Sequence, residues 1–367
     1  MQRALELVEA EVSERSRWHF LVLRHGDRVA VGECSDAGDR ARLLEQLAAA
    51  CRRLVGRDLV ADRQAVLADL EDQVSRTDAD GRLVTATLMG GLEQMMVDHA
   101  AQAAGEPVWK WLGGSDPGSV PVYANINRMP GGRSPEDVAA MARRAVGAGF
   151  TSVKCAPFDV SVPGEPLATT GMARLRAIRA AIGDEVELKV DCHERLPAEE
   201  VHRLLPSLED LGIAWLEDAV SIGSVAELRA LRAATALPLA GGELLFDPEE
   251  ARAAVADRLI DVLMPDVKHA GGVERVLRVA RSAPDLAISL HNPSGPVATA
   301  ASAHTFAACS NATVLEYQFG ETPWRSELVS GLERVVNGRL HLNDRPGLGV
   351  TLQPNHPSCR VLWSTTI

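Results

Sequence analysis

Three short apolar runs at even intervals constrain the fold of this chain more than any other feature. Each run ends in an acidic residue, Asp191, Glu217 or Glu243, and the intervals between these acids are 26 residues and 26 residues again. Helix-like segments lie between the runs. A strand–helix repeat of this length brings successive parallel strands side by side. We therefore expect three carboxylates at the same end of three neighbouring strands.

The three acids predict a metal site. Carboxylates that lie close together away from water repel one another and resist ionising together. A hard divalent cation removes this repulsion, and Mg²⁺ prefers oxygen ligands. We interpret Asp191, Glu217 and Glu243 as Mg²⁺ ligands. The alternative is three unrelated acids on a solvated rim.

From residue 121 onward the sequence alternates between strand and helix patterns. The predicted strands are 122–127, 151–156, 187–193, 213–218, 237–243, 260–266, 286–291 and 313–319, with a helix between each consecutive pair. Strict alternation over about 200 residues favours a parallel β/α barrel of the TIM type. A doubly wound sheet is the alternative, but no GxGxxG loop follows any predicted strand.

The first part of the chain has a different pattern. Alternating residues at 4–11, 17–24 and 29–34 predict antiparallel strands, and helical periodicity follows at 39–55 and 83–104. We predict a small α+β domain over residues 1–118 and a barrel domain over residues 119–330. Residues 331–367 are expected to pack back on the first domain and complete it.

Composition excludes several classes of protein. The net charge of −12, without a basic stripe, argues against a nucleic-acid partner. No apolar run reaches the roughly 18 residues of a membrane span. The N-terminus meets Glu6 before any apolar run and does not read as a signal peptide. The six dispersed cysteines, without CxxC spacing, predict reduced thiols and a cytoplasmic location.

Nearly every predicted barrel strand ends in a polar or ionisable residue. In a β/α barrel the chemistry occurs at these carboxyl ends. The candidates are Asn125, Asn127, Lys154, Asp191, His193, Glu217, Glu243, Asp266, Lys268, His291 and Glu316. Because strands have a period of two, Asp191 and His193 are expected to share a face, as are Asp266 and Lys268.

This arrangement resembles the enolase superfamily, in its mandelate racemase/muconate lactonizing enzyme type, along nearly the whole chain. The matching features are the three acids, the strand end Val153-Lys154, the run Met264–Gly272, the run Leu290–Pro296 and the strand end Leu315-Glu316. The resemblance implies a modified (β/α)₇β barrel with an α+β capping domain. It also implies Mg²⁺ and a small-molecule carboxylate substrate.

The resemblance also implies roles for individual residues. A metal on the substrate carboxylate stabilises the enediolate that forms when the α-proton leaves. His291 resembles the family's base, and Asp266 the acid that orients it. Glu316 resembles the acid that hydrogen-bonds the substrate carboxylate, for which it should be protonated. Lys154 adds positive charge there, or serves as a base if the metal depresses its pKa.

Two features distinguish this chain within the superfamily. Racemases of this branch carry Lys-x-Lys on the second barrel strand, whereas Ala156 occupies the second position here. Two-base racemisation therefore lacks one base. Asp191-Cys192-His193 resembles the Asp-x-His pattern of sugar-acid dehydratases, in which the histidine protonates the departing β-hydroxyl. Hydroxide is a poor leaving group, so an acid is needed on that side.

The leading hypothesis is a Mg²⁺-dependent dehydratase of a hydroxylated carboxylate, expected to be an acid sugar, with His291 as base and His193 as acid. The first alternative is a racemase or epimerase that uses Lys154 or Lys268 with His291. The second alternative is a non-catalytic member of the fold. The residues expected to contact substrate hydroxyls or carboxylates are Asn127, Arg128 and Arg195.

The link between the first two strands, Ser13 to Trp18, is short. Related proteins form a lid from this stretch. A brief lid predicts a more open pocket, or a pocket closed by a neighbouring subunit. Barrels of this type often associate, and we expect a homo-oligomer.

Overall fold

Eight parallel strands form a closed barrel in the computed structural model, which describes residues 3–14, 16–331, 334–353 and 355–367. The strands are β4 (Val120–Asn125), β5 (Ser152–Cys155), β6 (Glu187–Asp191), β7 (Trp215–Glu217), β8 (Leu239–Gly241), β9 (Val262–Leu263), β10 (Ala287–Leu290) and β11 (Ala312–Gln318). Each strand pairs with the next, and β11 pairs with β4 to close the ring. The predicted fold class is confirmed.

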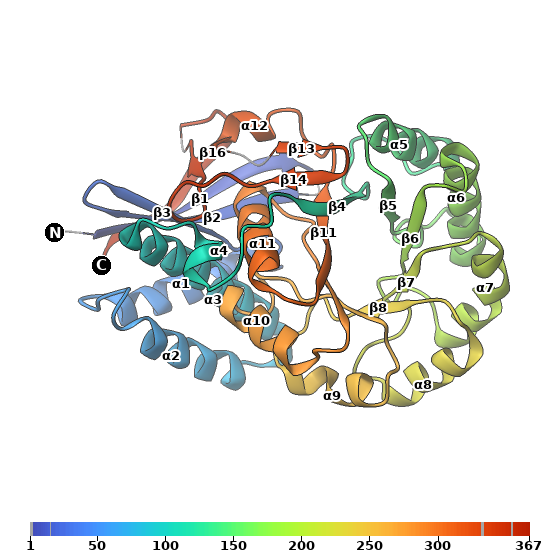
Figure 1. Ribbon diagram of the computed structural model, residues 1–367, viewed down its shortest axis with the longest axis horizontal. Coiled ribbons are helices and arrows are strands. Elements are labelled where there is room, and N and C mark those ends of the chain that lie inside the picture. Colours follow the sequence, from blue (N-terminus) through green and yellow to red (C-terminus); the bar gives the residue numbers. More distant parts are fainter. Residues whose placement is uncertain (1–2, 15, 332–333, 354) are drawn as a thin grey trace.

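One helix of at least nine residues follows each barrel strand except the last, β11, and these helices surround the barrel (Figure 1). They are α5 (Pro135–Gly147), α6 (Leu167–Ile182), α7 (Ala198–Asp210), α8 (Val225–Ala234), α9 (Pro248–Ala256), α10 (Val273–Ser282) and α11 (Pro296–Ala308). Their starts follow local signals. At α5, Ser134 and Asp137 form a reciprocal capping box, and Pro135 occupies the first turn.

The N-terminal part forms an antiparallel sheet covered by helices. Its strands are β1 (Arg3–Ser13), β2 (Ser16–His25), β3 (Arg28–Glu33) and the C-terminal β16 (Cys359–Thr366); its helices are α1 (Arg40–Leu54), α2 (Arg63–Arg76), α3 (Ala79–Ala104) and the short α4 (Val108–Trp111). The long α3 crosses β3 so closely that a Cβ on Gly32 would lie 1.9 Å from the Gly91 carbonyl oxygen. Glycine is therefore required at this crossing.

The C-terminal segment contributes to both parts of the molecule. β16 pairs with β1 and completes the capping sheet (Figure 1). The hairpin of β13 (Arg334–Val336) and β14 (Arg339–His341) instead extends the barrel sheet from β4. Before the hairpin in the chain, α12 (Arg325–Leu328) leads into β12 (Val329–Ser330), which pairs with β15 (Thr351–Leu352). The domain boundaries at residues 118 and 330 stay predictions.

Six of the eight barrel strands are shorter than predicted, whereas β4 and β11 keep the predicted length. β6 ends at Asp191, and His193 and Glu194 have left-handed φ values of 44° and 52°. β9 covers only Val262–Leu263, and Asp266 and Lys268 lie in the irregular segment and turn that follow. The chain leaves the sheet at the barrel mouth, so the two-residue strand period does not extend to these positions. The expectation of shared faces based on that period therefore does not apply here, although the side chains of each pair do meet, Asp191 with His193 at 3.0 Å and Asp266 with Lys268 at 3.1 Å.

Neither a disulfide nor a membrane-spanning helix occurs in the described part of the chain. All six cysteines are free. The longest helix, α3, has 26 residues but carries the charged residues Glu93 and Asp98, and no described helix is long and apolar enough to cross a bilayer.

Candidate active site

A cavity of about 590 Å³ opens at the carboxyl ends of the barrel strands. Residues from successive strand ends line it: Asn125, Asn127, Lys154, Asp191, His193, Glu243 and His291. The capping domain contributes Asp36, which follows β3, and Leu83 of α3. The structure thus brings most of the predicted site residues to one cavity between the barrel and the cap. Glu217, Asp266, Lys268 and Glu316 are not among the lining residues and lie fully buried.

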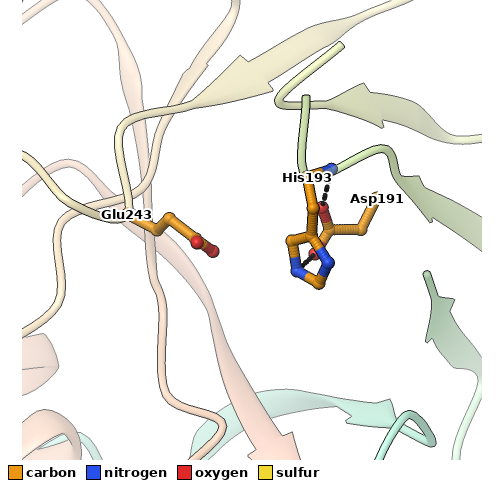
Figure 2. A group of neighbouring side chains, drawn as sticks. All are labelled: Asp191, His193 and Glu243. Atoms are coloured by element: carbon orange, nitrogen blue, oxygen red, sulfur yellow. Dashed lines mark hydrogen bonds and ion pairs between the residues drawn. The ribbon is translucent and has the colours of Figure 1, made fainter. Parts of the chain in front are cut away.

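Asp191, His193 and Glu243 form a close group in this cavity (Figure 2). One ligand atom from each lies within 4.8 Å of the others. Asp191 Oδ2 and Glu243 Oε2 are buried and accept no hydrogen bond of good geometry from the residues described. Each forms an ion pair with an imidazole nitrogen instead, Asp191 with His193 at 3.0 Å and Glu243 with His291 at 2.9 Å.

The third predicted ligand, Glu217, faces a different set of partners. Its Oε1 accepts a hydrogen bond from Lys154 Nζ at 2.6 Å, and its Oε2 accepts one from Trp215 Nε1 at 3.0 Å. His193 occupies the third place in the close group. The sequence analysis also missed Asp218, which directly follows β7 with a φ of 39° and is buried beside the group. In the sequence, only its position directly after Glu217 indicated that Asp218 could belong to the site.

The acidic cluster fits a divalent cation. Burial, followed by the charge of Asp191, raises the pKa of Glu217 well above its usual range. Burial, followed by the charges of Glu243 and Asp191, does the same for the pKa of Asp218. The buried carboxylates of Asp191, Glu217 and Asp218 and the partly buried carboxylate of Glu243 thus have too few cationic partners, and a bound cation would relieve their repulsion. The donors are mostly carboxylate oxygens, which hard cations prefer.

Lys154 is fully buried beneath the cluster. Its Nζ lies 2.6 Å from Glu217, 3.0 Å from Glu316 and 3.2 Å from Asp191. Burial lowers the pKa of Lys154, but Glu217 and Glu316 outweigh burial and hold this pKa well above its usual range. These contacts favour the predicted role of a fixed positive charge over that of a base.

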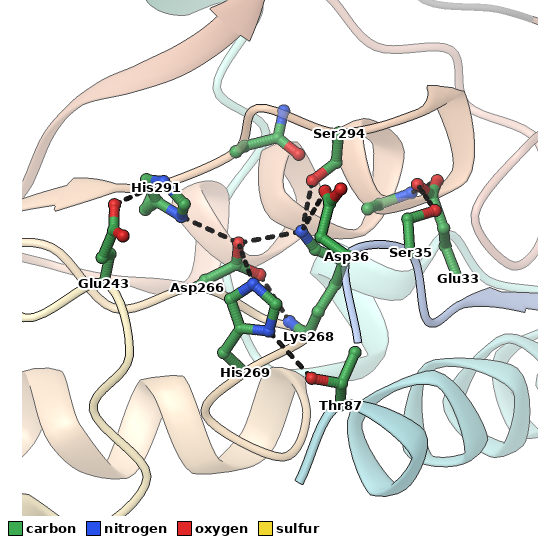
Figure 3. Close-up of polar contacts among 12 residues, drawn as sticks. Glu33, Ser35, Asp36, Thr87, Glu243, Asp266, Lys268, His269, His291 and Ser294 are labelled. Carbon is green, nitrogen blue, oxygen red and sulfur yellow. Dashed lines mark hydrogen bonds and ion pairs between the residues drawn. The ribbon is translucent and has the colours of Figure 1, made fainter. Parts of the chain in front are cut away.

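His291 and Asp266 form the predicted pair (Figure 3). His291 Nδ1 lies 2.9 Å from Asp266 Oδ2, and its Nε2 is directed to Glu243 at the cavity. Lys268 lies behind the pair, with its Nζ 3.1 Å from Asp266 Oδ2 and 2.5 Å from Ser294 Oγ. Burial raises the pKa of Asp266, but Lys268 and the two nearby histidines outweigh burial and hold this pKa below its usual range.

Glu316 bridges the first and last barrel strands. Its Oε1 accepts a hydrogen bond from Asn125 Nδ2 at 2.5 Å, and its Oε2 accepts one from the Asn292 backbone N–H at 2.9 Å. Burial raises the pKa of Glu316, but Lys154 and His291 outweigh burial and lower this pKa. Here the neighbouring cations favour the charged form of Glu316, and the expected protonation beside a bound substrate carboxylate stays a prediction.

His193 contacts two carboxylates. Its Nδ1 lies 2.8 Å from Asp159 Oδ1, and its Nε2 lies 3.0 Å from Asp191 Oδ2. Burial lowers the pKa of His193, but Asp191 and Asp159 outweigh burial and raise it to about 11. Asp159 follows β5 in the chain and lines the cavity. The sequence analysis missed Asp159, because the loop that carries it has no motif.

The three predicted substrate contacts all line the cavity. Asn127 Oδ1 accepts a hydrogen bond from the Ala156 backbone N–H at 2.7 Å, which links the ends of β4 and β5. Arg128 lies 3.1 Å from Asp36 of the cap and 3.4 Å from Ser16, the first residue of β2 after the short link from β1. Part of that link, residue 15, lies outside the described residues. The Arg195 side chain is 58% exposed.

Comparisons with known proteins agree with this architecture. Residues 137–356 match the family described as enolase C-terminal domain-like. A D-galactonate dehydratase of Verminephrobacter eiseniae is 32% identical over 283 residues, covering 74% of this chain and 73% of the relative. A D-xylonate dehydratase of Haloferax volcanii is 28% identical over 291 residues, covering 74% of this chain and 68% of the relative. Both relatives are named as dehydratases, which are hydro-lyases.

A solved structure has the same fold along nearly its whole length. The mandelate racemase/muconate lactonizing enzyme-like protein of Rubrobacter xylanophilus is 28% identical, with a TM-score of 0.85, and the match covers 95% of this chain and 94% of that one. The predicted resemblance is confirmed. This chain belongs to the enolase superfamily and is of the mandelate racemase/muconate lactonizing enzyme type.

Proposed function

We propose that this protein is a Mg²⁺-dependent dehydratase of an acid sugar. The observation that carries the proposal is the placement of two histidines around one acidic cluster. His291 Nε2 lies 2.9 Å from Glu243, and His193 Nε2 lies 3.0 Å from Asp191. Elimination of water needs a base for the α-proton and an acid for the β-hydroxyl, and two such histidines supply both. Relatives named as D-galactonate and D-xylonate dehydratases support the substrate class.

Each side chain has a place in this reaction. His291, oriented by Asp266, takes the α-proton at Nε2. Lys154 holds positive charge next to the substrate carboxylate. His193 gives a proton to the departing hydroxyl. Mg²⁺, when bound, would stabilise the second negative charge that develops on the substrate carboxylate.

We assign Asp191, Glu217 and Glu243 to Mg²⁺ and keep His193 for acid catalysis. Chelation by His193 in place of Glu217 is the competing assignment, because His193 belongs to the close group. The variant His193→Asn separates the two. Under our assignment it keeps the metal and loses dehydration. A loss of stoichiometric metal in His193→Asn, measured by elemental analysis, would transfer the ligand role to His193.

The contacts of the two lysines count against the racemase alternative. Lys154 is held by three carboxylates. Lys268 is fully buried and is not a lining residue of the cavity. A racemase needs a second base that reaches the substrate, and neither lysine meets this requirement in these contacts.

A panel of acid sugars tests the proposal. The purified protein with Mg²⁺ is incubated with D-galactonate, D-gluconate, D-xylonate, D-mannonate and their epimers, and 2-keto-3-deoxy products are trapped with semicarbazide. We expect product from at least one acid and none after chelation of the metal. Deuterium incorporation at the α-carbon without loss of water would support the racemase. If the protein performs neither reaction with any acid of the panel, the non-catalytic alternative remains.

A further inference from the structure

The active site contains a second carboxylate–imidazole pair that repeats the design of the first. In the first pair, His291 follows β10 and its partner Asp266 follows β9, the neighbouring strand. In the second pair, His193 follows β6 and its partner Asp159 follows β5, again the neighbouring strand. In both pairs Nδ1 contacts the partner carboxylate, at 2.9 Å and 2.8 Å, and Nε2 faces the acidic cluster (Figures 2 and 3).

We propose that Asp159 is a positioning residue that holds His193 as the acid for hydroxide departure. By accepting the Nδ1 hydrogen, Asp159 supports the imidazolium form, in which both ring nitrogens carry a proton, and fixes the rotation of the ring, so that Nε2 presents its proton to the cavity. This inference rests on the proposed dehydratase function and extends it to a residue outside the superfamily motifs in this sequence.

The surroundings of Asp159 favour this role over a structural one. The Asp159 carboxylate contacts His193 at 2.8 Å and Arg195 at 3.5 Å, both of which line the cavity, and no contact between this carboxylate and the backbone of its own loop is found among the described residues. The His193 side chain is 28% exposed, so close packing alone does not hold the ring. Without Asp159 the ring would keep only the contact of its Nε2 with Asp191, and no described residue would fix Nδ1.

The step in which His193 would act as the acid is the elimination of water. The enediolate left by α-proton removal supplies the electron pair of the new Cα=Cβ bond. The Cβ–O bond breaks with its electron pair going to oxygen, and that oxygen takes the proton from His193 Nε2 and leaves as water. The enol product then gains a proton at Cβ, loses the proton of its α-hydroxyl and becomes the 2-keto-3-deoxy acid.

Paired measurements on single variants test the inference. The variants are Asp159→Ala and Asp159→Asn, and Glu194→Gln is the control, because Glu194 is an exposed acid next to His193 in the chain. Each protein, loaded with Mg²⁺, receives the panel acid that the wild type dehydrates. Product formation is followed by semicarbazide trapping, and exchange of the α-proton is followed by NMR in D₂O.

We expect the rate of dehydration to fall while the rate of α-proton exchange is retained. Dehydration by Asp159→Ala should fall by about 10²-fold or more, in the range for loss of general-acid catalysis. Exchange at the α-carbon should persist, because it depends on His291, so the ratio of exchange to dehydration rises. Asp159→Asn, which keeps an acceptor for Nδ1, should lie between Ala and wild type. An analogue with fluoride at the β-carbon should restore elimination in Asp159→Ala, because fluoride leaves without full proton transfer.

Other outcomes overturn the inference. If exchange and dehydration fall together in Asp159→Ala and the fluoride analogue gives no rescue, Asp159 supports the site as a whole. If the wild type dehydrates a panel acid and the Asp159 variants keep the wild-type ratio, only this inference fails. If the wild type neither exchanges nor dehydrates any panel acid, the proposed function fails and the inference fails with it.

Discussion

At the scale of single residues, the charge balance of the acidic cluster determines what the site can hold. Asp191 contacts Lys154 at 3.2 Å and His193 at 3.0 Å. Even so, the charge of Asp191 is the second cause, after burial, of the raised pKa of Glu217. Two cations thus satisfy Asp191 itself without neutralising the cluster around it. The repulsion is relieved either by protonation of Glu217 or Asp218, whose pKa values are raised, or by a further cation.

We predict that Asp191→Asn abolishes Mg²⁺ binding without unfolding the protein. In the wild type, Mg²⁺ at about 100 times its dissociation constant should stabilise the fold by about 2.7 kcal/mol. This stabilisation should be absent in Asp191→Asn and unchanged in Asp184→Asn, which alters an exposed acid. Thermal unfolding with and without Mg²⁺ measures it, and stoichiometric metal in Asp191→Asn would contradict the ligand assignment.

We predict that His291→Gln loses exchange of the α-proton as well as dehydration. A general base contributes roughly 10²–10⁴-fold to the rate, so both reactions should fall by at least about 10²-fold. NMR in D₂O with a dehydrated panel acid measures the first reaction, and semicarbazide trapping the second. His202→Gln is the control, because His202 lies on the outer helix α7 and hydrogen-bonds the Ala198 carbonyl of the same helix. Full exchange by His291→Gln would assign the base elsewhere.

The sequence predicted residues whose position follows from a strand end, and it missed those placed by the loops. Asp191, Glu243 and Lys154 were predictable because each ends or closely follows a strand in a ring of parallel strands. Glu217 was placed at the right strand, but its pairing with Lys154 and Trp215 depends on side-chain rotation. Asp159 lies on the loop after β5, and no local sequence pattern predicts the conformation of that loop.

At the scale of elements, helices were predicted more closely than strands. Helix α11 begins at Pro296 and ends at Ala308, as predicted, because proline at the first turn gives a local start signal. The end of a barrel strand depends on where its hydrogen bonds to the neighbouring strand stop. The local sequence does not encode this pairing, so the strand ends were predicted less closely. Helix α2 (Arg63–Arg76) was missed although Val66, Leu70 and Val74 repeat at intervals of four. Its cap residue, Asp62, makes no side-chain capping bond, so the start signal is weak.

One buried histidine joins three elements. His304 of α11 accepts a hydrogen bond at Nδ1 from the Trp109 backbone N–H of α4 at 3.2 Å. Its Nε2 then carries the hydrogen and donates to the Leu348 carbonyl of the C-terminal segment at 3.3 Å. This arrangement requires the neutral ring. Burial lowers the pKa of His304 from 6.5 to about 4.

We predict that this histidine makes the fold less stable in acid. In the unfolded chain the ring gains a proton near pH 6.5, whereas the folded protein resists protonation until about pH 4. The free energy of unfolding therefore has its full value with respect to this ring above pH 6.5 and falls as the pH drops to 4. At ~1.4 kcal/mol per pH unit, the loss amounts to about 3 kcal/mol. His304→Gln, which can accept and donate at the same places, should remove this part of the pH dependence in urea unfolding. An unchanged slope would contradict the assignment.

At the scale of the whole molecule, two buried acids of the capping domain bind the N-termini of two consecutive barrel helices. Glu33, at the end of β3, accepts hydrogen bonds from the Gly295 and Ala298 backbone N–H groups of α11, each at 2.8 Å. Glu93 of α3 accepts them from Val273 and Glu274 of α10, at 2.8 Å and 3.1 Å. Carboxylates satisfy the unpaired N–H groups of a helix start and interact favourably with its dipole.

These contacts leave no space for side chains on the helix starts. A Cβ on Gly295 would lie 2.7 Å from a Glu33 oxygen, and one on Gly272 would lie 2.5 Å from the Glu93 carboxyl group. Since α10 and α11 flank the strand that ends before His291, the cap fixes the helices on both sides of the catalytic base. The cap and the barrel should therefore unfold as one cooperative unit.

We predict that Glu33→Gln and Glu93→Gln each weaken this junction. A glutamine offers one acceptor oxygen and turns an amide donor toward the second N–H group, so each change leaves a buried N–H group without an acceptor and should cost about 1–3 kcal/mol. The stabilities are compared above neutral pH, because burial raises the pKa of Glu33 and raises that of Glu93 to about 7. The sites contact different helices, so the double variant should lose about the sum of the two. Glu136→Gln, an exposed acid in the first turn of α5, is the control and should cost under about 1 kcal/mol. Urea unfolding measures the stabilities, and amide hydrogen exchange reports whether the cap opens before the barrel in the double variant. Wild-type stability in both single variants would show that the cap is held by its apolar contacts alone.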